Sequence, residues 1–202
     1  MKNVSIAVFS RYALGILAMA MAMLFIYLYR NSFSILAASA YLFLICATDT
    51  IYSKIPNIFT VIFITVGFFT NIIISGLPGV LFSVTGFIVG IALLLIPFLM
   101  GGMGAGDVKA LAALGAFLGP SMTFHIFLYM GCIGGLLGLF FHILSSDIKE
   151  EVHHYITSVK TVYLTRNCKL LRAYKNRTTY RFPYATSIAF GYFALIHWGK
   201  FL

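Results

Sequence analysis

The sequence predicts an all-α protein that crosses a membrane several times, as a polytopic bundle of about seven (six to seven) transmembrane helices. Of its 202 residues, 61% are hydrophobic and only 9% are charged. A soluble domain carries about 25% charged residues, because water must solvate its surface. Several uncharged runs also approach the roughly 20 residues that a helix needs to span a bilayer. Both observations favour a surface that faces lipid.

The uncharged runs give the first four helices in order. Residues 13–29 and residues 33–48 each provide one span. The first run is longer than the apolar core of a signal peptide and is followed by further spans, so we interpret it as a retained helix. The uncharged stretch of residues 55–106 is long enough for two spans, and residues 71–79, which include glycine and proline, supply the turn between them.

The last three helices come from two further uncharged stretches. Residues 110–146 must hold two helices, but at about 1.5 Å per residue they are too short for two full spans. We therefore expect a turn at Gly119 and Pro120 after a short or tilted helix at 107–119. Residues 182–199 form the last span. Glycines at helical spacing before the last polar segment should allow close helix approach; they are Gly131, Gly134, Gly135 and Gly138.

One long polar segment, residues 145–181, separates the last two spans and carries eight of the fourteen Lys and Arg residues. The positive-inside rule makes it a cytoplasmic loop. Its charge also favours contact with anionic lipid headgroups. This loop accounts for much of the net charge of +9, so we do not expect nucleic-acid binding. Residues 1–202 are interpreted as a single membrane domain with this basic loop inserted near its end.

Two of the five acidic residues, Asp49 and Asp107, lie outside the basic loop and next to predicted spans. An ionisable group beside a membrane span is costly and usually marks function. With the loop in the cytoplasm, counting helices backward puts both aspartates on the cytoplasmic side. One follows the second helix and the other begins the fifth.

Two carboxyl groups close together in a site of low dielectric constant cannot easily both ionise, so they share a proton. One can then accept a proton from water while the other donates to a scissile carbonyl group, as in aspartic proteases. Helix capping is the simpler explanation, since Asp107 sits where a helix dipole favours a carboxylate. A small transporter that uses Asp49 and Asp107 as proton or cation sites is the alternative from another class.

Asp107 ends a glycine-rich run, residues 101–106, whose backbone can approach a substrate strand closely. The run is not a phosphate-binding loop, because Asp107 stands where that loop requires lysine.

Metal and cofactor sites are not expected. Cys46, Cys132 and Cys168 form no C-x-x-C pair. His153 and His154, near two loop glutamates, are interpreted as part of a solvated loop face.

Two motifs carry a resemblance to a known family. Gly104-Ala105-Gly106-Asp107-Val108-Lys109 resembles the G-x-G-D motif of membrane aspartic proteases of the prepilin peptidase family. Asp49 is followed, after residues 50–54, by Ile55-Pro56-Asn57, which is similar to that family's first motif. Pro183-Tyr184, with Ala189 and Gly191, resembles the start of its last helix.

The resemblance implies a catalytic pair, Asp49 and Asp107, without metal or cofactor. It implies that Gly104, Gly106, Lys109, Pro56 and Asn57 bind substrate or shape the site.

It further implies an aspartic endopeptidase of a bacterial or archaeal plasma membrane that removes the leader of type IV pilin-like precursors at the cytoplasmic face. Larger family members also N-methylate the product and carry paired C-x-x-C motifs. This chain lacks those motifs, so we expect peptidase activity without methylation, as in the small enzymes that serve Flp/Tad-type pili.

Overall fold

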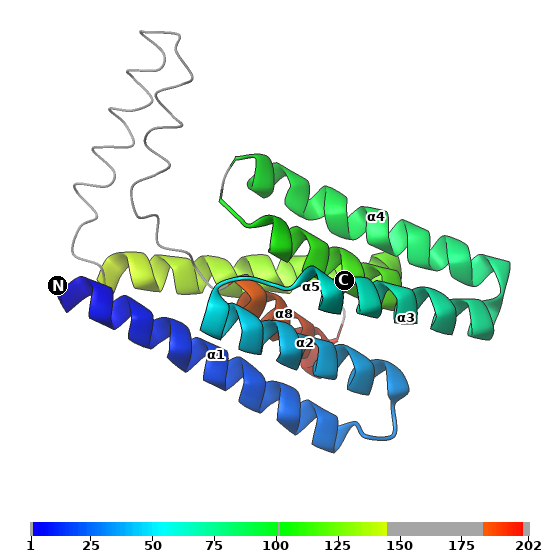
Figure 1. The fold of residues 1–202 in the computed structure, drawn as a ribbon, viewed down its shortest axis with the longest axis horizontal. Coiled ribbons are helices and arrows are strands. Elements are labelled where there is room, and N and C mark those ends of the chain that lie inside the picture. The colour runs from blue at the N-terminus through cyan, green and yellow to red at the C-terminus, as the bar shows by residue number, and fades with distance from the viewer. Residues whose placement is uncertain (1, 101, 145–183, 200–202) are drawn as a thin grey trace, which may run out of the picture.

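The computed structural model describes residues 2–100, 102–144 and 184–199, and the elements in these ranges are helices (Figure 1). In chain order they are α1 (Lys2–Leu28), α2 (Phe33–Tyr52), α3 (Asn57–Ser75), α4 (Leu77–Leu99), α5 (Ala105–Leu144) and α8 (Tyr184–Trp198). Five of them contain a stretch long and apolar enough to cross a membrane. The predicted fold class is confirmed: the protein is a multi-pass helical bundle. The predicted basic loop at 145–181 lies outside the described residues.

The turn between α3 and α4 lies at Gly76, as the sequence predicts, although Asn71 belongs to α3 and not to the turn. Gly76 has a φ of +61°, a conformation that side chains disfavour, so glycine ends the helix without strain. Pro78 lies in the first turn of α4, where its missing N–H group has no helical partner to lose. The α1–α2 turn lies at the same end of the bundle, on the right of Figure 1.

Helix α5 reverses direction at Gly119, where φ is 82° and ψ is 174°. The two segments form a hairpin, because both of them approach the start of α8. Gly134 lies against Ser187 of α8, and the charge of Asp107 acts on Tyr184. Figure 1 shows the chain returning along its own first segment. The predicted turn at Gly119 and Pro120, with a short first helix, is therefore confirmed.

The reversal leaves a gap in the helical hydrogen bonds, because Pro120 has no N–H to donate to the carbonyl of Ala116. Asn71 of α3 fills this gap. Its Nδ2 donates to the carbonyl oxygens of Ala116 at 3.2 Å and Phe117 at 3.3 Å, and to Ser83 Oγ at 2.9 Å. A backbone carbonyl in the bilayer interior needs such a partner because no water is available there.

Close helix crossings in the bundle use other glycines than the sequence predicts. Gly86 of α4 meets the backbone of Gly115, and Gly90 meets that of Ala112. Gly67 of α3 faces the backbone of Phe117, whose Cα would lie 2.9 Å from an added Cβ. The first segment of α5 thus fits tightly against α3 and α4.

Among the described residues, the later glycines show the predicted close approach at one position. An added Cβ at Gly131, Gly135 or Gly138 would meet nothing within 4 Å in the part of the chain that the structure describes. Gly134 lies against Ser187 of α8. Within the described residues, the spacing of these glycines therefore marks a helix face of which one position meets another helix.

Helix α8 is the most completely buried element, since Ala185 to Ala189 and Gly191 to Leu195 are all buried. It packs against α5, α1 and α2 (Figure 1). Tyr192 is only 1% exposed and Phe193 only 2%. A short helix in this central position brings its N-terminus to the end of α2 and the start of α5, where both predicted aspartates lie.

Candidate active site

Asp49 lies in the last turn of α2 and is half-buried. Its carboxylate accepts a hydrogen bond from the backbone N–H of Ala185, in the first turn of α8. This N–H is one of the first four of that helix, which have no partner within the helix. Asp49 Oδ2 has no hydrogen-bond partner among the described residues. Oδ2 is itself buried, so within the described part of the chain the carboxyl group keeps one oxygen without a partner beside its bond to α8.

Asp107 lies in the first turn of α5 and is 8% exposed. Its Oδ2 accepts the backbone N–H of Gly104 at 3.1 Å, and its own N–H donates to the carbonyl of Gly104 at 3.2 Å. This reciprocal pair closes the loop before α5 into a tight turn. An added Cβ at Gly104 would lie 3.2 Å from that carboxylate oxygen, so a side chain there would crowd the group.

The structure brings the two predicted carboxyl groups within electrostatic reach of each other. The charge of Asp49 acts on Asp107, and the charge of Asp107 acts in turn on Tyr184 of α8. The aspartates come from separate helices that reach the same end of the bundle, as the topology derived from the sequence required. A pair of interacting carboxyl groups in a largely buried site can hold one proton between them and exchange it with a substrate.

The other predicted site residues surround this pair. Pro56 precedes the first residue of α3, Asn57. Lys109 Nζ donates to Asn57 Oδ1 at 3.1 Å, so this exposed bond ties α5 to α3. An added Cβ at Gly106 would lie 3.3 Å from the Ile55 side chain. The Ile55-Pro56-Asn57 segment and the glycine motif thus pack directly on each other.

Sequence reasoning missed two groups that contact this region. The N–H of Ala185 is a backbone donor and has no signature of its own, although the start of the last helix was marked by Tyr184. Arg11 of α1 donates from Nη2 to the carbonyl of Thr50 at 2.7 Å and from Nη1 to Ser53 Oγ. Its charge acts on Asp49. An arginine shortly before the first uncharged run, residues 13–29, was the available signal.

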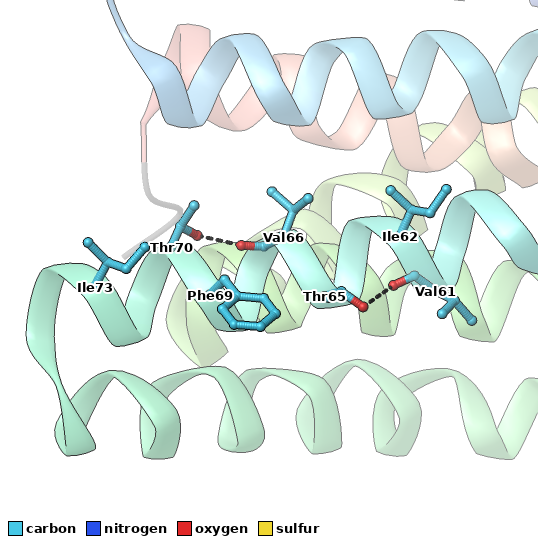
Figure 2. A pocket seen from close by; sticks show the side chains of 7 residues that line it. All are labelled: Val61, Ile62, Thr65, Val66, Phe69, Thr70 and Ile73. Atoms are coloured by element: carbon cyan, nitrogen blue, oxygen red, sulfur yellow. Dashed lines mark hydrogen bonds between the residues drawn. The ribbon is translucent and has the colours of Figure 1, made fainter.

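A shallow groove along α3 offers no groups for chemistry. Figure 2 shows its lining, which comes from this one helix: Val61, Ile62, Thr65, Val66, Phe69, Thr70 and Ile73. The two threonine hydroxyls donate back to carbonyls of their own helix, that of Thr65 to Val61 and that of Thr70 to Val66. The groove therefore presents an apolar surface to its surroundings.

In the part of the chain that the structure describes, no three His, Cys, Asp or Glu side chains gather where they could hold a metal ion. Cys46 is buried, and its thiol lies 3.5 Å from the carbonyl of Ala185. His153 and His154 lie outside the described residues.

Comparison with known proteins gives one match. The model of the type IV leader peptidase family matches residues 35–139, which include both aspartates and both motifs around them. No curated protein matches the chain, and no solved structure matches it. The matched region is more than half of the 202 residues. The chain therefore belongs to the type IV leader peptidase family, and it is a peptidase of that kind.

Proposed function

We propose that the chain is an aspartic endopeptidase that removes the leader peptide from type IV pilin-like precursors, with Asp49 and Asp107 as its catalytic pair. One observation supports this most directly: two carboxyl groups from different helices lie within electrostatic reach of each other at one end of the bundle, each held by a backbone N–H. Family membership supports the peptidase activity.

The reaction uses the pair in opposite protonation states. The ionised carboxylate accepts a proton from a water molecule, whose oxygen attacks the scissile carbonyl carbon. The protonated partner donates to the carbonyl oxygen, which gives a neutral tetrahedral diol. The carboxyl group that took the proton of water then donates it to the amide nitrogen, while its partner takes back a proton from a diol hydroxyl. The C–N bond breaks, which releases an amine and a carboxylic acid and restores the starting protonation states. Because protons only move between the pair and the substrate, this scheme includes no metal ion.

The backbone donors orient the pair for this sequence. The N–H of Ala185 fixes the Asp49 carboxylate, whose buried Oδ2 has no partner among the described residues and can accept the proton of a water molecule that enters with the substrate. The N–H of Gly104 fixes the carboxyl group of Asp107. Donors held by folded backbone need no rearrangement as the charges shift during the reaction.

The glycine loop sets the expected specificity. Gly102 and Gly104 are exposed at the start of α5, and their backbone can approach an extended peptide. A substrate residue in this narrow space must itself be small. A precursor with glycine just before the cleaved bond fits, while its apolar helix stays in the bilayer.

The charges near the site favour a cytoplasmic location. Lys54 and Lys109 are exposed close to the pair, and the sequence places residues 145–181, with eight basic residues, on the same side. The positive-inside rule puts this side in the cytoplasm of a bacterial or archaeal plasma membrane. The loop is expected to contact anionic headgroups there. We propose that the protein has no methyltransferase activity.

The test is cleavage of a purified precursor by the purified protein in detergent, with the products identified by mass spectrometry. We expect one cut directly after the leader's last glycine. Replacing that glycine by valine should slow cleavage by an amount that corresponds to about 1–3 kcal/mol, by analogy with overpacking. Replacing a leader lysine is the matched control and should matter less. An intact precursor after prolonged incubation would contradict the proposal, and equal rates for glycine and valine would contradict the role of the loop.

A further inference from the structure

Arg11 is the only charged residue of the first span, Ser10–Leu28. A charged side chain in a membrane span is costly, and it usually faces the protein interior and a partner. Arg11 is half-buried and turns toward the end of α2, where Asp49 lies. It also lies outside residues 35–139, the region that the family model matches.

Arg11 contacts two residues that follow Asp49 at the end of α2. Nη2 donates to the carbonyl of Thr50 at 2.7 Å, and Nη1 donates to the hydroxyl of Ser53. One turn further along α1, Gly15 lies against the Thr50 side chain, so the two helices approach closely at this level. The position of the guanidinium group is thus set by tight packing of α1 on α2.

The end of α2 needs such support. The last carbonyl groups of a helix have no partner within it, and a cation there also offsets the negative end of the helix dipole. Ser53, which follows α2, has a φ of 52°, in the left-handed region that side chains disfavour. Its N–H donates to the carbonyl of Asp49 at 2.9 Å. Any movement of Ser53 would therefore be passed to Asp49.

We infer that Arg11 is a positioning residue for Asp49, an inference that rests on the proposed peptidase function. Arg11 fixes the last turn of α2, and through it the direction of the Asp49 carboxyl group toward Asp107. It also places a positive charge near that carboxylate. The first helix, outside the family match, thereby becomes part of the active-site architecture.

A purely structural role predicts a different outcome from a positioning role. If Arg11 only stabilised the fold, its loss would lower the melting temperature and the amount of active protein, but not kcat per folded molecule. If it positions Asp49, kcat falls while substrate binding, reported by KM, changes little. A small displacement of a catalytic group is enough to cost about 100-fold in rate.

The experiment measures kcat, KM and melting temperature in detergent for Arg11→Met, Arg11→Lys and Arg30→Met, with the wild type and Asp107→Asn in the same assay. Arg30 is an exposed arginine in the turn that follows the opposite end of α1, and it serves as the matched control. We expect Arg11→Met to lower kcat about 10- to 100-fold with KM within about threefold. Arg11→Lys should recover part of the loss because lysine keeps the charge and one donor group. Arg30→Met should equal the wild type.

Wild-type kcat for Arg11→Met, or a loss seen only in KM or in the amount of folded protein, would overturn the inference. If Arg11→Met does not insert into the membrane, the kcat of Ser53→Ala tests the inference instead. That change removes one acceptor of Arg11, and an unchanged kcat would then overturn the inference. A wild-type protein that leaves the precursor intact would instead overturn the proposed function, so the two failures are distinguishable.

Discussion

Glycines interrupt the helical backbone at both ends of the first α5 segment. The polar groups at these two interruptions differ in their hydrogen bonding. At Gly119 the carbonyl groups freed by the reversal are bound by Asn71. Before Asp107, by contrast, Gly102 and Gly104 are exposed, and Asp49 Oδ2 nearby has no partner among the described residues. A satisfied polar group stabilises a membrane fold, whereas a buried unsatisfied one is costly and usually marks function. This contrast separates the residues expected to affect stability from those expected to affect catalysis.

Gly119→Ala should have the largest effect on stability. An added Cβ would clash with the Phe82 ring, and φ at this position is +82°. With ψ at 174°, Gly119 has a conformation that essentially only glycine adopts, and such strain costs about 1–3 kcal/mol. Overpacking costs about 1–3 kcal/mol. We expect a clearly lower melting temperature in detergent, with kcat per folded molecule unchanged. Gly135→Ala, where an added Cβ has open space, is the control; equal melting of the two variants would contradict the account of the reversal.

Asn71→Leu should have a smaller effect of the same kind. It removes the donor to two carbonyl groups and leaves them unsatisfied in the bundle, which costs about 1–3 kcal/mol. Thr65→Val is the matched control, since the Thr65 hydroxyl only donates back to its own helix on an exposed face. If Asn71→Leu melted like the control but lost kcat, the division between the two ends of the segment would be wrong.

Lys109→Met should have the smallest effect. Its bond to Asn57 is exposed, and such bonds contribute about 0.5–1.5 kcal/mol at most. We expect a loss of a few-fold in kcat/KM, because the bond holds α3 against the start of α5. Asn57→Leu should lose a similar amount, and the double variant little more, as expected for two groups that interact with each other. Fully additive losses would show that this bond is not the cause.

Much of the fold could be predicted because membrane helices are long, apolar and separated by recognisable residues. Gly76 and Gly119 ended helices where expected, and the short helix before Gly119 followed from the length of residues 110–146. The packing glycines could not be predicted. Lipid and protein neighbours are both apolar, so spacing alone does not show which face meets another helix; Gly86 and Gly115 do so, whereas Gly131 does not.

The candidate site was predictable where its chemistry requires particular side chains. Asp49 and Asp107 stood out because carboxylates are rare beside spans, and topology put them at one end. The donors around them were not predictable in the same way. Ala185 contributes only a backbone N–H, and Arg11 reaches Thr50 through a contact between distant parts of the sequence. Such groups depend on how helices pack, which the sequence motifs do not specify.

The most direct test of the catalytic pair is the single-turnover cleavage rate of Asp49→Asn and Asp107→Asn on a purified precursor. Asp147→Asn, in the basic loop, is the matched control, and melting temperatures check that each variant folds. Because an amide cannot accept the proton of water, we expect each site variant to lose roughly 100- to 10,000-fold in rate while melting like the wild type. The control should cleave normally. Cleavage at the wild-type rate by either folded site variant would contradict the proposal that Asp49 and Asp107 act together.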